Sequence, residues 1–365
     1  MNVAFGTVPF PDRPSDACVG RPAAKVKPPE PALPLIGAGA HAIAQATAEP
    51  VETAGTREAK IMRIGRLLAV TATLGLLAGT GAAMAAEKYT YLHHATPTNV
   101  FWQAVKKGMD EACGQIEADC QMIFLQQDGN FQEQLNNLEA VIAQKPDGII
   151  MTFAGGAIFD EALDRAAAAG IPVLGSNVDH PEKTHRLSFT GQDLEQAGYD
   201  LAAGLAPQFP KDGPIHVLIG ISGPGQVWAE SRGAGIARFM DDYKKANPGR
   251  DITYEKIDSG LDLSVTGQRV AAYVQSKPTT AYFDVGYWAA GAAVSLRDLG
   301  KKPGEVLLAC FDLVPVVMDE MKTGYIQLTI DQQPFLQGYV PIHQLHMMNK
   351  YKLGAFDANT GKALV

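Results

Sequence analysis

Cysteine is scarce in this 365-residue chain, which contains four. The four lack the CxxC pairs of a zinc site and the density of a disulfide-built scaffold. Cys18 lies near the start and Cys310 lies in an apolar run, which leaves Cys113 and Cys120 as a close pair. In an oxidising compartment this pair can form a disulfide, and two reduced thiols fit the sequence equally well.

Basic clusters and long apolar runs are also missing. The formal net charge is −8 and lysine and arginine are scattered, so we expect neither a nucleic-acid partner nor an anionic membrane surface. The apolar run at residues 67–80 is too short to cross a bilayer, which takes roughly 20 apolar residues.

The sequence motifs of common enzymes are absent as well. The chain has no GxxxxGK[ST] phosphate loop, and Ser222 does not stand in a GxSxG turn. His343 and His346 lie one helical turn apart without carboxylates nearby, which favours a structural or surface role over metal binding. We therefore expect no catalytic residues, no metal and no cofactor.

The sequence from residue 62 has the pattern of a secretory signal. Two arginines follow Met62, residues 67–80 are apolar, and the small-x-small tripeptide Ala-Met-Ala ends at Ala85. This order is typical of a cleaved signal peptide. We predict a signal peptide over residues 62–85, cleaved near Ala85, and a periplasmic protein.

Residues 1–61 are rich in proline and alanine and show no apolar periodicity. Such a composition cannot bury enough apolar surface to offset the entropy of ordering. We predict a disordered leader or a gene start placed too far upstream.

Strand and helix patterns alternate after residue 86. Apolar runs such as residues 148–153 predict buried strands, and apolar positions at helical spacing predict the helices between them. The alternation indicates α/β lobes with mostly parallel sheets covered by helices. The strand and helix at residues 89–112 are echoed at residues 215–240, each with an early aromatic and a basic-Gly pair. We therefore predict two similar Rossmann-like lobes.

Candidate ligand contacts follow the strands of both lobes, where open α/β sheets bind ligands. Aromatic faces cover the C–H faces of a ring, and polar side chains bond hydroxyl groups. The set suits an uncharged, polyhydroxylated ligand of monosaccharide size. Its members are Asn99, Phe101, Trp102, Asn177, Asp179, Trp228, Arg232, Asp284, Trp288, Asp312 and Gln332.

Each of these residues also has a structural interpretation. Trp102 and Trp288 could be core residues, and the acids could be helix N-caps. His93 and His94 end the first strand, where pocket lining and simple packing are equally compatible with the sequence.

From residue 87 to about residue 353 the chain resembles type I periplasmic binding proteins of sugar ABC transporters, the ribose- and galactose-binding-like group. The resemblance is carried by five segments that in the family hold ligand contacts or a hinge crossing. They are TNVFWQAVKKG at 98–108, GSNVD at 175–179, ESRG at 230–233, ACFD at 309–312 and TIDQQP at 329–334.

Two departures bear on the ligand. The family often has Asp-Arg where this chain has Asp179 and His180, and its usual Asn-Asp after a second-lobe strand is replaced by Val285 and Gly286, with Asp284 one position earlier. Ribose and galactose are therefore not implied, and another pentose, a polyol or a sugar-like signal molecule would fit equally well.

The resemblance implies two lobes joined by a three-crossing hinge, with residues 86–190 and 333–365 in the first and residues 191–332 in the second. It implies a monomer that captures a monosaccharide or polyol in the interlobe cleft and delivers it to an inner-membrane ABC permease with ATPase subunits. A sensor of a sugar-like signal coupled to a membrane receptor would share this sequence. The same fold forms the ligand-binding core of bacterial repressors, but the predicted signal peptide argues against a repressor. An exported enzyme would need a catalytic acid and base, such as Asp179 and Asp312.

Overall fold

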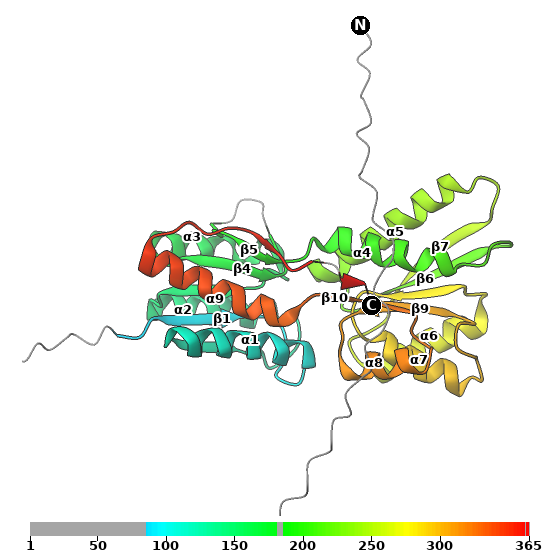
Figure 1. Ribbon diagram of the computed structural model, residues 1–365, viewed down its shortest axis with the longest axis horizontal. Coiled ribbons are helices and arrows are strands. Elements are labelled where there is room, and N and C mark those ends of the chain that lie inside the picture. The colour runs from blue at the N-terminus through cyan, green and yellow to red at the C-terminus, as the bar shows by residue number, and fades with distance from the viewer. Residues whose placement is uncertain (1–84, 181–184, 362, 365) are drawn as a thin grey trace, which may run out of the picture. The chain divides into compact units, whose positions relative to one another are not determined.

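The computed structural model describes residues 85–180, 185–361 and 363–364, which belong to one compact unit. The leader predicted at residues 1–61 and all but the last residue of the signal peptide predicted at 62–85 lie outside the described residues. The described part forms two six-stranded sheets flanked by helices (Figure 1). The predicted fold class, two Rossmann-like α/β lobes, is confirmed.

The first sheet has the strand order β11-β5-β4-β3-β1-β2, and its paired strands are parallel. Two buried apolar clusters lie between this sheet and its helices. Helices α1 and α9 pack along each other (Figure 1). The elements are β1 (Lys88–Leu92), α1 (Val100–Ile116), β2 (Asp119–Ile123), α2 (Phe131–Gln144), β3 (Gly148–Met151), α3 (Asp160–Ala168), β4 (Val173–Asn177), β5 (Phe189–Gly191), α9 (Pro334–Tyr351) and β11 (Ala358–Asn359), with a 3-10 turn at Gly156–Phe159.

The second sheet has the order β12-β10-β9-β8-β6-β7, in which β12 pairs antiparallel to β10 and the other pairs are parallel. It too has buried apolar clusters against its helices. Its elements are α4 (Leu194–Leu205), β6 (Ile215–Ile221), α5 (Val227–Ala246), β7 (Ile252–Asp258), α6 (Leu263–Ser276), β8 (Ala281–Asp284), α7 (Ala289–Asp298), β9 (Leu307–Phe311), α8 (Pro315–Lys322), β10 (Leu328–Asp331) and β12 (Ala363–Leu364), with a 3-10 turn at Ala206–Gln208.

The chain passes between the two sheets after β5, after β10 and between β11 and β12. The sequence-based prediction places residues 333–365 in the first lobe. Residues 363–364 differ from this prediction, because β12 pairs with β10 of the second sheet. The side chain of Gln192, in the first crossing, donates to the backbone oxygens of Asp331 and Gly361 in the other two. One buried amide therefore connects the three crossings.

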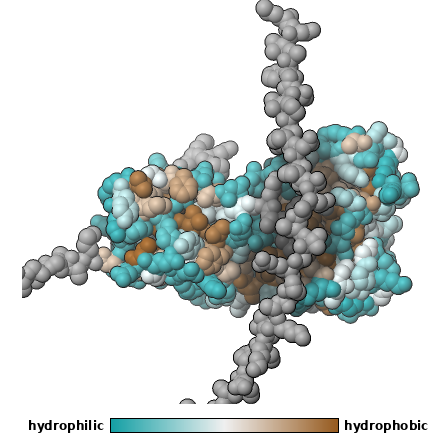
Figure 2. Space-filling view, viewed as in Figure 1, coloured by the Kyte–Doolittle hydropathy of each residue, from teal (hydrophilic) through white to brown (hydrophobic). Residues whose placement is uncertain are grey.

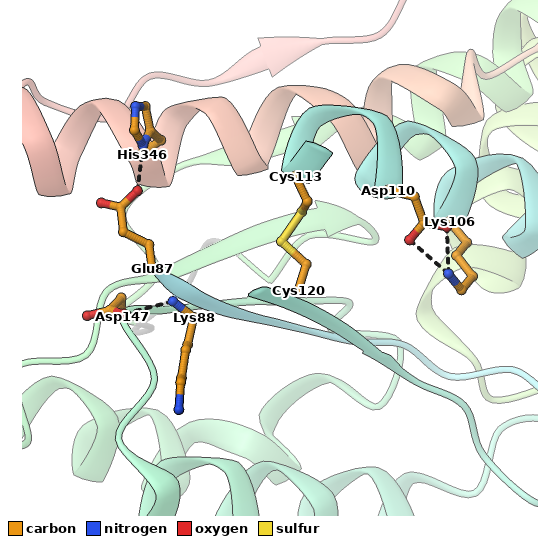
Figure 3. Close-up of a disulfide and its surroundings, with 8 residues drawn as sticks. All are labelled: Glu87, Lys88, Lys106, Asp110, Cys113, Cys120, Asp147 and His346. Atoms are coloured by element: carbon orange, nitrogen blue, oxygen red, sulfur yellow. Dashed lines mark hydrogen bonds and ion pairs between the residues drawn. A yellow bond between two sulfur atoms is a disulfide. The ribbon is translucent and has the colours of Figure 1, made fainter. Parts of the chain in front are cut away.

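Cys113 and Cys120 form a disulfide, which answers the question the sequence left open (Figure 3). The bond joins the last turns of α1 to the start of β2, and the intervening turn ends the helix with Glu117 in a left-handed conformation. Cys310 is a buried free thiol. The disulfide thus fixes the return of the chain from α1 into the sheet.

Loss of this disulfide should cost stability. The two cysteines are seven residues apart in the sequence. Closing a loop of this length lowers the entropy of the unfolded chain, which adds about 2 kcal/mol to the free energy of unfolding. We expect the free energy of unfolding of the double variant Cys113→Ser, Cys120→Ser to be lower by that amount, and its urea midpoint to be lower accordingly. Reductant should lower the wild-type midpoint alike and leave the double variant unchanged, whereas an unchanged wild type would contradict the bond's role.

The visible face is mostly hydrophilic, with separate apolar patches (Figure 2). Exposed large apolar side chains occur at the end of α9 and just after it, at Tyr351, Leu353 and Phe356.

None of the helices in the described part of the chain combines the length and the apolarity that crossing a membrane takes.

Candidate functional site

A pocket with about 400 Å³ of empty space is lined by residues that follow strands of both sheets. Nine of the eleven residues proposed from sequence line it, namely Asn99, Phe101, Trp102, Asn177, Trp228, Arg232, Trp288, Asp312 and Gln332. His94, Gly286 and Tyr287 complete the lining.

Aromatic rings form much of the pocket wall. The indole rings of Trp228 and Trp288 lie 6.1 Å apart at 29°, and Tyr287 stacks on Trp288 at 4.4 Å and 20°. On the first-lobe side, Phe101 meets Trp102 edge to face at 5.2 Å. The Trp228 indole N–H donates to the side-chain oxygen of Gln226 at 2.8 Å, which fixes the ring. Such rigid, flat faces suit the C–H faces of a ring-shaped ligand.

One buried cation and one buried anion share the pocket. Arg232, from α5, donates from Nη1 to the backbone oxygen of Val285 at 2.9 Å, and its guanidinium lies 4.0 Å from the ring centre of Phe311. Its Nε has no hydrogen-bond partner. Asp312 follows β9 and accepts from the side-chain amide of Gln332. The charges therefore balance, and Arg232 retains a donor for a bound group.

Burial moves the pKa values of both charged groups. Desolvation lowers the pKa of Arg232 to about 10, against the attraction of Asp312. Desolvation raises the pKa of Asp312 to about 6, although Arg232 and the Gln332 amide act in the opposite direction. Both side chains are therefore mainly ionised at neutral pH.

The two histidines after β1 have different positions. His94 lines the pocket and its Nδ1 lies 2.9 Å from the hydroxyl of Thr152, whereas His93 stacks on Trp102 at 4.3 Å. Burial, followed by the positive charge of Arg232, lowers the pKa of His94 to about 3. His94 is therefore neutral in the pocket, and His93 supports the ring of Trp102.

Polar uncharged side chains enter the pocket from helix and strand ends. Asn99 caps α1 by accepting from the backbone N–H of Phe101 at 3.1 Å. Asn177 ends β4 in a left-handed conformation with a φ of 66°. Gln332 follows β10, and its side-chain oxygen is buried without a hydrogen-bond partner. A buried acceptor without a partner is costly, so a hydrogen-bond donor placed beside it would be stabilising.

Asp179 and Asp284 are not among the pocket-lining residues, contrary to the sequence-based expectation. Asp179 pairs with Arg186 instead, from Nη2 at 2.7 Å. Asp284 is completely buried behind the pocket, where it accepts from the backbone N–H of Gly286 at 2.9 Å and from the hydroxyl of Ser222 at 3.1 Å. One acid neutralises an arginine in its own lobe and the other shapes the loop that carries Trp288.

Sequence reasoning did not select Gly286 and Tyr287. Tyr287 adjoins Trp288, and a second aromatic beside a candidate aromatic was a usable signal. Gly286 carries no side chain, and a Cβ atom there would lie 2.1 Å from the Trp288 ring. Within the described residues no cluster of three or more histidine, cysteine or acidic side chains could hold a metal ion.

Comparison with known proteins gives one family match. Residues 92–352 match the family model described as periplasmic binding protein domain. The xylose/arabinose-binding protein XylF of Sulfolobus acidocaldarius is 26% identical in an alignment of 275 residues that covers 71% of this chain and 65% of that protein. The present chain therefore spans just under two thirds of that relative's length.

Solved structures show the same fold. A periplasmic sugar-binding protein of an ABC sugar transporter from Legionella pneumophila is 26% identical, with a TM-score of 0.69 over 75% of this chain and 99% of that one. An ABC transporter solute-binding protein from Burkholderia graminis, in complex with D-arabinose, is 23% identical, with a TM-score of 0.66 over 76% and 94%.

Proposed function

The chain belongs to the periplasmic binding protein domain family, and from this premise we propose that it captures a monosaccharide or a polyol in the pocket between its lobes. The family is one of binding proteins rather than enzymes. The observation that carries the proposal is that one buried arginine and one buried aspartate line the same pocket together with several aromatic rings.

The charge balance of the pocket favours an uncharged ligand. Arg232 and Asp312 offset each other, and His94 is neutral because burial lowers its pKa. A sugar acid would add a net charge to this buried lining, and an amino acid would add two opposite charges, which is costly. Hydroxyl groups, which both donate and accept, fit the free Arg232 donor and the unpartnered Gln332 acceptor.

We assign the remaining pocket residues to ring and hydroxyl contacts. Phe101, Trp228 and Trp288 would cover the apolar faces of the ring. Asn99 and Asn177 would bond hydroxyl groups from the first-lobe side. The names of the relatives support pentoses as the first class to test, because one binds xylose and arabinose and another was crystallised with D-arabinose.

Capture would proceed by hinge closure. A ligand held by one lobe brings the other lobe onto it, and contacts that exist only when both lobes meet stabilise the closed state. We further propose that the protein is a periplasmic monomer, exported by its signal peptide, that passes its ligand to an ABC permease with ATPase subunits. The relatives described as ABC transporter components support this partner.

A thermal-shift screen tests the ligand class. Protein from residue 86 onward, unfolded and refolded to remove co-purified ligand, is heated with pentoses, hexoses, polyols, sugar acids and amino acids. A ligand that binds only the native state at a hundredfold excess over its Kd adds about 2.7 kcal/mol of stability. We expect a raised midpoint with a subset of neutral sugars or polyols. A rise with sugar acids or amino acids alone would contradict the proposal.

A further inference from the structure

Gln337 is a fully buried polar residue that does not line the pocket. It lies in the first turns of α9, the helix that follows the second crossing between the lobes. A buried amide in a helix interior is unfavourable unless its donors and acceptor are satisfied. The bonds that satisfy this one reach both the pocket wall and the hinge.

The Gln337 side chain contacts three separate segments. Its Oε1 accepts from Nδ2 of Asn177 at 3.0 Å. Its Nε2 donates to the backbone oxygen of Gln332 at 2.9 Å and lies 3.4 Å from the hydroxyl of Thr360. Asn177 ends a first-lobe strand, Gln332 belongs to the second crossing and Thr360 to the third.

The bonds continue into the second lobe. The side-chain amide of Gln332 donates to Oδ1 of Asp312, which follows β9. A hydrogen-bonded series therefore runs from Asn177 through Gln337 and Gln332 to Asp312, and three of its four members line the pocket. Gln337 is the member that the pocket does not contain.

The backbone at this series is held in uncommon conformations. Asn177, Asp312 and Gln333 have φ values of 66°, 76° and 53°. The other three non-glycine residues with positive φ among the described residues, Glu117, Lys145 and Lys352, are ordinary helix C-caps. Left-handed residues outside helix C-caps persist where surrounding bonds hold them. Here Asn177 bonds Gln337, Asp312 bonds Gln332, and Gln333 bonds Asp331.

We propose that Gln337 is a positioning residue that couples the first-lobe wall of the pocket to the hinge. Its amide holds the Asn177 side chain and the Gln332 backbone in one arrangement, so that the lobes meet the ligand with both contacts in place. This role rests on the proposed function of the pocket, because it describes how that same site is held ready for its ligand.

The chain offers a matched control on the same helix. Gln344 is also buried and lies two turns further along α9. Its Oε1 accepts from the Ser188 hydroxyl at 2.9 Å and from the Phe356 backbone N–H at 3.2 Å. Gln344→Met therefore removes a buried amide of equal size without touching the pocket or the crossings.

Hydrogen exchange of the ligand-free protein tests the coupling directly. We expect Gln337→Met to speed amide exchange at least about tenfold in peptides over both residues 175–179 and 331–337. The variant leaves the buried partners of Gln337 without a hydrogen bond, and the lost stability corresponds to a change in exchange rate of that order. Gln344→Met should leave both peptides unchanged. Asn177→Ala, which removes the bond from its other end, should also speed exchange at 331–337. Unchanged exchange at 331–337 in both Gln337→Met and Asn177→Ala would overturn the proposal.

Sugar binding tests the consequence, with D-xylose and L-arabinose as probes. For whichever probe binds the wild type, Gln337→Met should raise Kd about tenfold and Gln344→Met should not. The double variant Asn177→Ala, Gln337→Met should lose less than the product of the single losses, because both remove one bond. Multiplicative losses would overturn the coupling. If neither probe binds the wild type, these two pentoses are excluded as ligands, while the exchange experiment still decides the role of Gln337.

Discussion

Arg232→Met should abolish most ligand binding while leaving the protein folded. Arg232 is 3% exposed and is the cation of the pocket. A hydrogen bond from a charged donor in a dry site contributes about 1.5–3 kcal/mol, so we expect Kd to rise by roughly a hundredfold. The sugar that gives the largest thermal shift is the probe, and titration calorimetry is the measurement.

The fold should survive because the buried charge is itself costly. Desolvation lowers the pKa of Arg232 in the folded state, which means that burial disfavours its charged form. Without this cation Asp312 can take up a proton more easily, since the attraction of Arg232 is what holds its pKa down. Methionine also retains much of the packing against the Phe311 ring.

Arg238→Met is the matched control. Arg238 lies on the same helix, is half-exposed, and pairs with Glu195 at 3.0 Å away from the pocket lining. This variant should bind sugar as the wild type does. If ligand-stripped Arg232→Met protein unfolds cooperatively and binds sugar with the wild-type Kd, the role of Arg232 is contradicted. An equal loss of affinity in both variants would point to a general effect on α5.

Acidification should stabilise the ligand-free fold and weaken ligand binding at the same time. Burial raises the pKa values of Asp312 and Asp284 to about 6, above the ordinary 3.8. Between pH 6 and about 4 the folded state then binds more protons at these two groups than the unfolded state does. Their contribution to the free energy of unfolding therefore rises as the pH falls, by on the order of 3 kcal/mol each.

Ligand binding should have the opposite dependence. A protonated Asp312 loses the negative charge that attracts Arg232 and accepts from ligand hydroxyls, so affinity should fall up to about tenfold per pH unit below 6. Urea denaturation and sugar titration at pH 7, 6 and 5 measure the two trends.

Two asparagine variants separate the acids. Asp312→Asn should flatten both the binding profile and part of the stability profile. Asp284→Asn should flatten the stability profile with less effect on the slope of binding, because Asp284 lies behind the pocket and bonds Gly286 and Ser222. A wild-type binding profile that is flat from pH 7 to 5 would contradict the assignment of Asp312 to the ligand.

The fold was predictable because its signals are local. The apolar run at residues 215–221 coincides with β6, and helix starts such as Asn99 carry their own caps. Boundaries shifted at strand ends: the apolar run at residues 148–153 predicts a strand over its whole length, and β3 ends at Met151. The antiparallel β12 was missed, since a two-residue strand has no periodicity to read.

The site was predictable only where strand ends decide it. Residues that follow strands converge on one edge of a parallel sheet, and this places Asn177 and Asp312 in the pocket. The same rule does not bring Asp179 into the pocket lining, and its carboxylate pairs with Arg186. It could not find Gln337, which stands inside a helix and acquires its role from bonds to segments 160 and 5 residues away in the sequence.

Tryptophan fluorescence tests the central claim most directly. The chain contains three tryptophans, and all three, Trp102, Trp228 and Trp288, line the pocket. A neutral sugar that fills it should therefore change the emission in a saturable, one-to-one manner, and Arg232→Met should remove this change. If no pentose, hexose or polyol alters the emission of folded, ligand-stripped protein, the pocket is not a sugar site.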